Sequence, residues 1–163
     1  MVNENNHLLT AAARSGDLET LNALIASGQA VDNRDEKGYT PFIIACYNRQ
    51  PKAAKVLLAA GADVNAADFG GNTALMGACF KGYSDIVELL LESGANVDQQ
   101  HGNGGTALMF AAMFGRNELI EILLKQGADL HITDTRGLTA FDLAAQQGNE
   151  GGIAIMEAHL KLS

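Results

Sequence analysis

Cysteine, histidine and acidic side chains are the groups in this chain that could support nucleophilic, metal or acid–base chemistry. The two cysteines, Cys46 and Cys79, are 33 residues apart, and no local motif joins either of them to a histidine. The histidines show no i, i+3 or i, i+4 spacing, which would place two metal ligands on one helix face; they are His7, His101, His131 and His159. No Ser/His/Asp set can be assembled from local motifs either. The sequence therefore predicts no metal site, no cofactor and no catalytic centre.

A glycine-rich segment, residues 102–105, superficially resembles a phosphate-binding loop. It reads Gly-Asn-Gly-Gly, but it lacks the lysine of a P-loop and no buried strand precedes it. The sequence therefore argues against nucleotide binding by this segment.

The chain repeats itself with a period of 33 residues. One ladder consists of threonines, each two residues after a glycine, namely Thr40, Thr73, Thr106 and Thr139. A second ladder of glycines has the same period: Gly28, Gly61, Gly94 and Gly127. Two ladders with one period indicate stacked structural repeats. We therefore predict one domain over residues 1–163, with units at 2–33, 34–67, 68–100, 101–133 and 134–163, of which the degenerate first and last act as caps.

Each unit is expected to contain two short helices followed by a turn. Thr40 fits a helix N-cap, and Pro41 fits the first helical position, where its missing N–H does no harm. In the middle unit the first helix is expected to end near Gly82, which can adopt the left-handed conformation. The second helix carries an apolar stripe over residues 86–91 and ends at Gly94. One unit cannot bury this stripe alone, so stacking supplies the core.

Two motifs recur at the period of 33: Asp-x-x-Gly-x-Thr-(Pro/Ala)-(Leu/Phe) and Leu-Leu-x-x-Gly-Ala-(Asp/Asn)-Val-(Asn/Asp). They resemble the ankyrin repeat, with the best match over residues 68–100. The resemblance implies an all-α solenoid of stacked helix-turn-helix units with short projecting hairpin loops. It also implies that the hairpin loops and the ends of the first helices line a concave groove that binds a partner.

Composition excludes several classes of function. The chain is 47% hydrophobic and 18% charged with a net charge of −8, and no cluster of Lys and Arg offers a footprint for nucleic acid or an anionic membrane. No apolar run approaches the ~20 residues needed to cross a bilayer. The polar residues 1–6 do not resemble a signal peptide, which predicts a cytoplasmic protein. The acidity favours a basic partner only weakly, through salt-dependent steering.

Four residues, at three positions of the repeat, depart from the pattern in ways that predict local features. Cys46 and Cys79 are expected to be buried, unpaired thiols, because packed helices lie ~8–10 Å apart and a disulfide needs Cα atoms within roughly 7 Å. His101 replaces the aspartate found at Asp35 and equivalent positions, where we expect a cap for the hairpin, so this finger should be looser. Arg49 replaces the glycine that ends the first helix elsewhere, which predicts a distorted turn.

Aromatic residues gather at the positions that would line the groove. Of the chain's nine aromatic residues, five fall there. We call the whole set the predicted binding strip, an apolar centre with a polar rim. Its members are Lys37, Tyr39, Tyr47, Phe69, Asn72, Phe80, Lys81, Met113, Phe114 and Arg136. An alternative interpretation is that Phe80 and Met113 pack between helices as ordinary core.

These features favour a monomeric protein–protein interaction module, either an adaptor or a stoichiometric inhibitor. A self-associating structural protein is the alternative, and concentration-dependent mass would distinguish it. An enzyme is the third class, and the sequence argues against it because no catalytic set can be assembled. Fold analogy alone does not separate these classes.

Overall fold

Threonine hydroxyl groups begin the first helix of three repeats. The Oγ1 atom of Thr40 accepts a hydrogen bond from the amide of Ile43 at 3.2 Å, and Pro41 occupies the first helical position. The Oγ1 atom of Thr106 does the same for the amide of Met109 at 3.3 Å. Both threonines are buried, so the bond satisfies a hydroxyl group that water does not reach. The predicted N-cap at Thr40 and the predicted place of Pro41 are confirmed.

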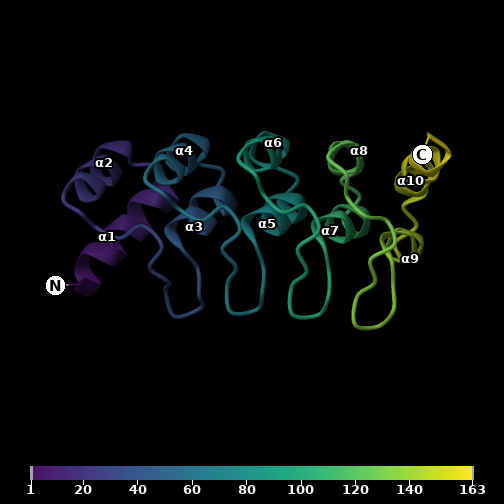
Figure 1. Cartoon of the computed structure of the whole chain (residues 1–163), viewed down its shortest axis with the longest axis horizontal. Coiled ribbons are helices and arrows are strands. Elements are labelled where there is room, and N and C mark those ends of the chain that lie inside the picture. Colours follow the sequence, from purple (N-terminus) through teal and green to yellow (C-terminus); the bar gives the residue numbers. More distant parts are fainter. Residues whose placement is uncertain (1, 163) are drawn as a thin grey trace. The chain divides into compact units, whose positions relative to one another are not determined.

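The computed structural model describes residues 2–162, which form ten α-helices in five antiparallel pairs (Figure 1). The pairs are α1 (Val2–Ser15) with α2 (Leu18–Ala26), α3 (Pro41–Tyr47) with α4 (Pro51–Ala59), α5 (Ala74–Lys81) with α6 (Ser84–Glu92), α7 (Ala107–Met113) with α8 (Asn117–Lys125), and α9 (Ala140–Gln146) with α10 (Glu150–Leu162). A hairpin loop follows each of α2, α4, α6 and α8. The predicted all-α architecture of helix-turn-helix repeats is confirmed.

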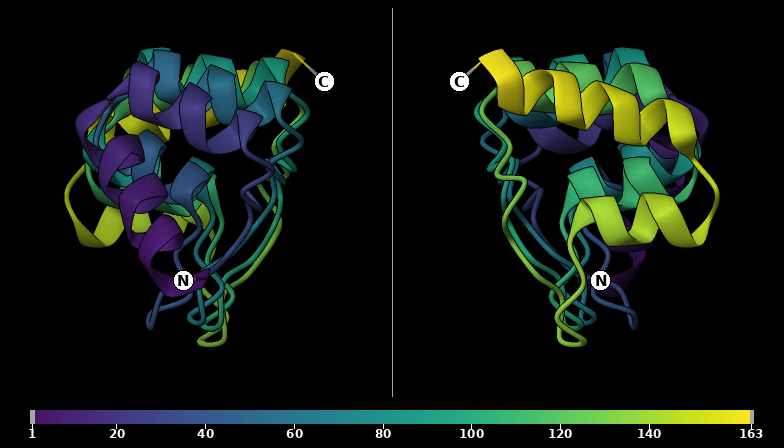
Figure 2. Two further views of the ribbon diagram at one scale, coloured as in Figure 1. Left: turned by 90° about the vertical axis from the view of Figure 1, so that its left-hand side faces the viewer. Right: turned by 90° about the vertical axis from the view of Figure 1, so that its right-hand side faces the viewer.

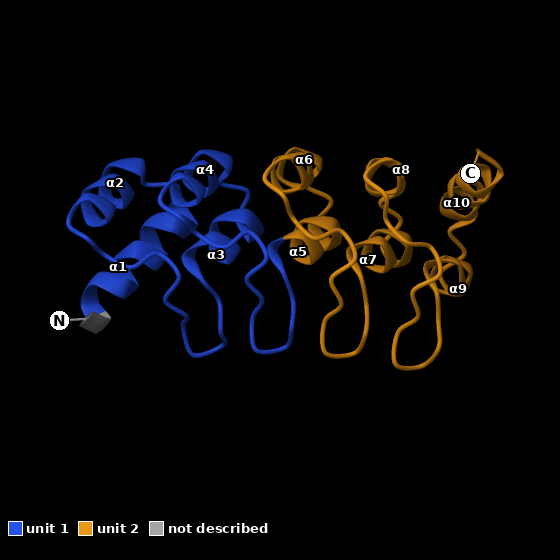
Figure 3. Cartoon of the chain, viewed as in Figure 1, with its two compact units in different colours: residues 1–74 blue, residues 75–163 orange. Residues whose placement is uncertain are grey.

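The chain divides into two compact units, residues 1–74 (unit 1) and 75–163 (unit 2) (Figure 3). In unit 1, α1 packs against α2 and α3, and α4 packs against the same two helices. Unit 2 repeats this arrangement, because α7 packs against α8 and α9, and α10 packs against the same two. The right-hand view of Figure 2 shows α10 lying over α9, with the hairpin loop that precedes α9 extending beyond it.

The core of each unit is built from leucine, isoleucine and alanine side chains. In unit 1, Leu9, Leu21 and Leu57 are completely buried, and in unit 2 the same is true of Ile120 and Leu123. Each such side chain contributes about 1.5–3 kcal/mol through removal from water. Alanines on the first helices are also fully buried and let neighbouring helices approach closely.

The turn between the two helices of a pair is closed in the same way in all five repeats. After each first helix one residue has a positive φ, namely Gly16, Arg49, Gly82, Gly115 and Gly148. The next amide then donates to an alanine carbonyl five residues back; the pairs are Asp17–Ala12, Gln50–Ala45, Tyr83–Ala78, Arg116–Ala111 and Asn149–Ala144, at 2.8–3.0 Å. The closure is a Schellman-type motif.

The predicted distortion at Arg49 is wrong. Arg49 has a φ of 53°, and the amide of Gln50 still donates to the carbonyl of Ala45 at 2.9 Å. The buried helices on both sides fix the turn, so the backbone keeps its path and the arginine adopts a left-handed conformation that an L-residue rarely takes. Pro51 occupies the first position of α4, as predicted.

We predict that Arg49→Gly raises the free energy of unfolding by about 0.5–1 kcal/mol. Left-handed backbone costs an L-residue about 1–2 kcal/mol, and the greater freedom of glycine in the unfolded chain offsets part of the gain. Urea unfolding measures the change. Arg49→Ala is the control, since it removes the same side chain but keeps the strain; equal stability of the two variants would contradict the prediction.

Candidate partner-binding surface

The four hairpin loops share one turn geometry. We call them fingers 1 to 4, residues 28–40, 61–73, 94–106 and 127–139. In finger 1 the Oδ1 atom of Asp35 accepts from the amides of Lys37 and Tyr39, both at 2.9 Å. Asp68 in finger 2 and Asp134 in finger 4 hold the equivalent amides at 2.8–3.0 Å. The predicted capping role of these aspartates is confirmed.

Finger 3 keeps this turn with a histidine in place of the aspartate. The amide of His101 donates to the carbonyl of Gly105 at 3.0 Å, and the amide of Gly104 donates to the carbonyl of His101 at 2.8 Å. The Nδ1 atom of His101 accepts from the amide of Asn103 at 3.0 Å, so the side chain caps one amide where aspartate caps two. The expected loosening is therefore limited to one lost side-chain bond.

Long polar side chains join neighbouring fingers within each unit. In unit 1 the Nη1 atom of Arg34 donates to the carbonyls of Gly38, at 2.9 Å, and of Ala67. In unit 2 the Nε2 atom of Gln100 donates to the carbonyls of Gly104 and Thr133 at 2.8 and 3.2 Å. Main-chain bonds between the fingers, from Phe69 to Lys37 at 3.2 Å and from Thr135 to Asn103 at 3.0 Å, lie beside them.

Sequence reasoning missed Arg34 and Gln100. They share one position in the repeat with Ala67 and Thr133, so long and short side chains alternate there along the chain. That alternation was the available signal. Each long side chain donates a hydrogen bond to the main-chain carbonyl of the short residue in the next finger.

Unit 1 holds five members of the predicted binding strip. Phe69 at the tip of finger 2 is 71% exposed, and Tyr47 at the end of α3 is 43% exposed. Lys37 is exposed and Tyr39 is half-buried on finger 1. The side-chain amide of Asn72 donates to both carboxylate oxygens of Asp68, at 3.2 and 3.3 Å, so it serves the turn of its own finger.

Unit 2 holds the other five members, and two of them form an aromatic pair. The rings of Phe80 and Phe114 meet edge to face with centroids 4.8 Å apart, and they are 36% and 42% exposed. The Arg116 guanidinium donates through Nη2 to the carbonyl of Phe80 at 3.1 Å, which ties the end of α5 to the turn after α7. Lys81, next to Phe80, is exposed.

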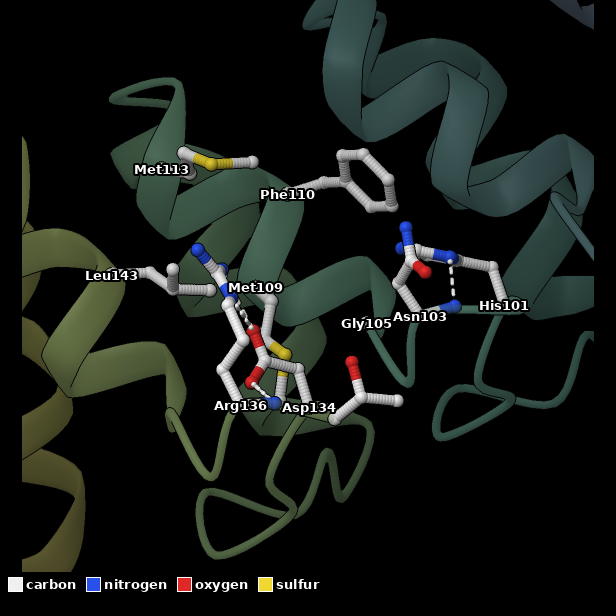
Figure 4. Close-up of a pocket in the computed structure, with 10 residues that line it drawn as sticks. His101, Asn103, Gly105, Met109, Phe110, Met113, Asp134, Arg136 and Leu143 are labelled. Carbon is white, nitrogen blue, oxygen red and sulfur yellow. Dashed lines mark hydrogen bonds and ion pairs between the residues drawn. The ribbon is translucent and has the colours of Figure 1, made fainter. Parts of the chain in front are cut away.

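The remaining two members, Met113 and Arg136, line a pocket in unit 2 (Figure 4). Its volume is about 480 Å³. Met113 is half-buried, and the exposed Arg136 forms an ion pair with Asp134 at 2.8 Å. The other lining residues are His101, Asn103, Gly105, Met109, Phe110, Asp134, Thr135 and Leu143.

Comparison with known protein families agrees with this geometry. A family model described as ankyrin repeats (3 copies) matches residues 8–101, and a second, described as ankyrin repeats (many copies), matches residues 90–144. The chain belongs to the ankyrin-repeat family. No curated protein matches the chain. Ankyrin repeats are in general protein–protein interaction modules and typically carry no enzymatic activity. In this ankyrin-repeat protein, each helix pair with its finger corresponds to one repeat.

The two thiols of the ankyrin-repeat protein are free and buried, as predicted. Burial raises the pKa of both Cys46 and Cys79 to about 12. A thiol with such a pKa is protonated at neutral pH and is a poor nucleophile. The described residues contain no group of three or more His, Cys, Asp and Glu side chains placed to hold a metal ion. Within residues 2–162 no helix is long and apolar enough to cross a membrane.

Asp134 is the acidic residue of the pocket, and the hydrogen bonds that it accepts lower its pKa. The amide of Leu138, together with the side chain and amide of Arg136, holds the pKa of Asp134 below its usual value, although burial opposes the shift. A carboxylate with a lowered folded-state pKa stabilises the fold above its unfolded-state pKa. That contribution is lost as the pH falls through the folded-state pKa.

We predict that Asp134→Asn destabilises the protein at neutral pH and that the difference from the wild type shrinks in acid. The asparagine oxygen can still accept the two amides, but it lacks the charge that pairs with Arg136. Urea unfolding of both proteins at neutral pH and below about pH 3.5, under the usual aspartate pKa, tests this. A difference that does not change with pH would contradict the assignment.

Proposed function

We propose that the protein binds a partner protein through the exposed residues of its fingers and of its first-helix ends, and that it acts by occupying the partner's surface as an adaptor or a stoichiometric inhibitor. The observation that carries the proposal is the exposed aromatic pair of Phe80 and Phe114. Exposed aromatic side chains that lie together reduce solubility and often mark an interaction site. Aromatic anchors also contribute much of the binding energy at protein interfaces.

Unit 1 supports the same proposal. Phe69 and Tyr47 are exposed there, and Lys37 supplies a charged rim. Finger 1 and finger 2 are held together by the main-chain bond from Phe69 to Lys37 and by the Arg34 bond to Ala67, so Phe69 is presented by a fixed backbone. A surface that is ordered before binding loses less conformational entropy when a partner docks.

Charge favours a basic partner. Residues 75–163 carry eleven acidic and five basic side chains, against eight and six in residues 1–74. The resulting field would speed encounter with a basic protein and would weaken as salt is added. An association rate that does not change with salt would count against the inhibitor version of the proposal. The buried free thiols support a reducing compartment, in line with the cytoplasmic expectation.

A capture experiment tests the proposal. The bait proteins are the wild type, a Tyr47→Ala/Phe80→Ala/Phe114→Ala variant, and a Leu8→Ala/Leu162→Ala control that removes exposed apolar side chains outside the predicted binding strip. Circular dichroism and urea unfolding first establish that all three are folded. We expect a protein that is captured by the wild type and the control but is lost with the triple variant.

Two outcomes would overturn the proposal. Equal capture by all three baits would place the interface elsewhere on the chain. If nothing is captured and the mass of the wild type rises with concentration, the exposed aromatic residues serve self-association, and the triple variant should then remain a monomer.

A further inference from the structure

Finger 3 differs from the other fingers at two linked positions. The first carries His101 where the others carry Asp35, Asp68 and Asp134. The second, four residues later, carries Gly105 where the others carry Tyr39, Asn72 and Leu138. The φ of Gly105 does not lie in the left-handed region, so the turn does not require glycine for its backbone conformation. The glycine must therefore be explained by the lack of room for a side chain at residue 105.

The imidazole of His101 occupies the space that a side chain at residue 105 would take. A Cβ atom on Gly105 would lie 2.5 Å from Nε2 and 2.9 Å from Cδ2 of His101. The imidazole also contacts the ring of Phe110, with centroids 5.4 Å apart and planes inclined by 45°. His101 and Gly105 are thus a matched pair, because a side chain at residue 105 would displace the imidazole from this position.

This pair leaves a hydrogen-bond donor at the wall of the pocket. The Nδ1 atom of His101 accepts from the amide of Asn103, so in the neutral ring the proton is on Nε2. None of the hydrogen bonds described within residues 2–162 uses that Nε2–H group. Figure 4 shows the imidazole beside Asn103 and Phe110 at one side of the pocket.

The acidic group of the pocket is already saturated. The Oδ1 atom of Asp134 accepts from the amides of Arg136 and Leu138, and Oδ2 accepts from Nε and Nη2 of the Arg136 guanidinium at 3.1 and 2.8 Å. The pair is neutral as a whole. The carboxylate is therefore fully used within finger 4, whereas the Nε2–H group of His101 is left as a donor at the opposite wall.

Four apolar side chains also line the pocket, beside the polar Asn103 and Thr135. Met109 and Leu143 are buried, and Phe110 and Met113 are half-buried, so their side chains form walls with little access to water. Methionine adapts its shape to different apolar groups. The volume of about 480 Å³ is that of a small ligand pocket and exceeds what one water molecule needs.

We propose that this pocket is the subsite for one large apolar side chain of an extended partner segment, and that a main-chain carbonyl of that segment accepts the Nε2–H of His101. The inference rests on the proposed function and names the chemistry that the partner must bring. A carboxylate is disfavoured because unit 2 carries eleven acidic and five basic side chains, and a carbonyl can accept the Nε2–H bond without adding negative charge. The residues that flank the apolar anchor are expected to be basic.

Methyl NMR of the five methionines tests the proposal without knowledge of the partner. The probes are N-acetyl-leucine methylamide, the matching alanine compound and the matching glutamate compound. We expect the leucine probe to shift the methyl signals of Met109 and Met113 in a saturable way. The alanine probe should bind about tenfold more weakly, because it buries less apolar surface.

A double variant supplies the matched control. His101→Asp/Gly105→Asn converts finger 3 to the residues of finger 2, where Asp68 holds the amide and side chain of Asn72. The variant places a side chain at residue 105 in the pocket lining and should fold at least as stably as the wild type, which urea unfolding verifies. We expect it to bind the leucine probe at least about tenfold more weakly.

Three results would overturn the inference: no saturable shift up to the solubility of the leucine probe, equal binding by the double variant, or tighter binding of the glutamate probe. Phe80 and Phe114 do not line the pocket, so a failure here leaves the capture experiment intact. Conversely, a failed capture does not change the response of the two methionine signals.

Discussion

Gly38→Ala is expected to lower the free energy of unfolding by about 2–4 kcal/mol, one of the two largest effects we predict. The φ of Gly38 is 86°, which an L-residue adopts only at a cost of about 1–2 kcal/mol. A Cβ atom would also lie 2.6 Å from the backbone nitrogen of Phe69 and 2.8 Å from its ring. The backbone of finger 2 cannot withdraw without breaking the bond from Phe69 to Lys37.

Gly28→Ala is the matched control for this prediction. Gly28 lies in the same finger with a φ of 88°, and nothing lies within 4 Å of the position of its Cβ atom. Its free energy of unfolding should fall only by the cost of the left-handed backbone, about 1–2 kcal/mol. Phe69→Ala in the Gly38→Ala background removes the ring but not the backbone clash, so it should restore only part of the loss. Equal destabilisation by Gly28→Ala and Gly38→Ala would show that the two fingers do not contact each other at this point.

Phe80→Ala and Phe114→Ala are each expected to weaken partner binding by about thirtyfold, the value of an interface anchor worth about 2 kcal/mol. Both rings are more than one-third exposed in the free protein, so their loss should cost the fold much less than it costs the complex. The two effects should not add, because the rings contact each other edge to face at 4.8 Å and each truncation removes the support of the other.

Calorimetric titration of the captured partner with the wild type, both single variants and the double variant checks this prediction. Leu162→Ala is the control, since it removes a side chain that is 88% exposed at the end of α10. It should leave the affinity unchanged. A loss of less than about threefold in both phenylalanine variants would remove the aromatic pair from the interface.

Most of the fold could be predicted from the sequence because each repeat carries local signals for the start and end of its helices. Thr40 and Pro41 mark a helix start through local chemistry, and Gly82 and Gly115 mark helix ends through a positive φ that glycine tolerates. These signals depend on residues close in the chain. Each signal recurs four times at one period, which indicates where most helix pairs begin and end.

Arg49 shows where local reasoning fails. The sequence predicts a distorted turn because an arginine should avoid the left-handed conformation, yet the turn keeps the hydrogen bond of the other four repeats. Packing of α3 and α4 against α1 and α2 outweighs the local preference of one residue. Whether local preference or packing decides the backbone conformation depends on tertiary contacts, and the sequence of a single repeat does not reveal these contacts.

The candidate site could be predicted only in its exposed part. Register alone indicates that Phe69 and Tyr47 are open to solvent. It does not reveal that Arg34 joins finger 1 to finger 2, or that His101 fills the space above Gly105, because both depend on atoms from two segments meeting in space. The glycine-rich segment at 102–105 was visible as unusual, but its meaning required the position of the imidazole.

Site-specific photo-crosslinking tests the central claim most directly. A benzoylphenylalanine residue is placed at Tyr47 or Phe114 in the predicted binding strip, or at Lys55 or Glu121, which are exposed on the second helices α4 and α8. The four proteins are irradiated in a lysate of the source cells. We expect a covalent adduct with one partner from Tyr47 and Phe114 and none from Lys55 or Glu121. An adduct formed only from Lys55 or Glu121 would contradict binding through the predicted binding strip.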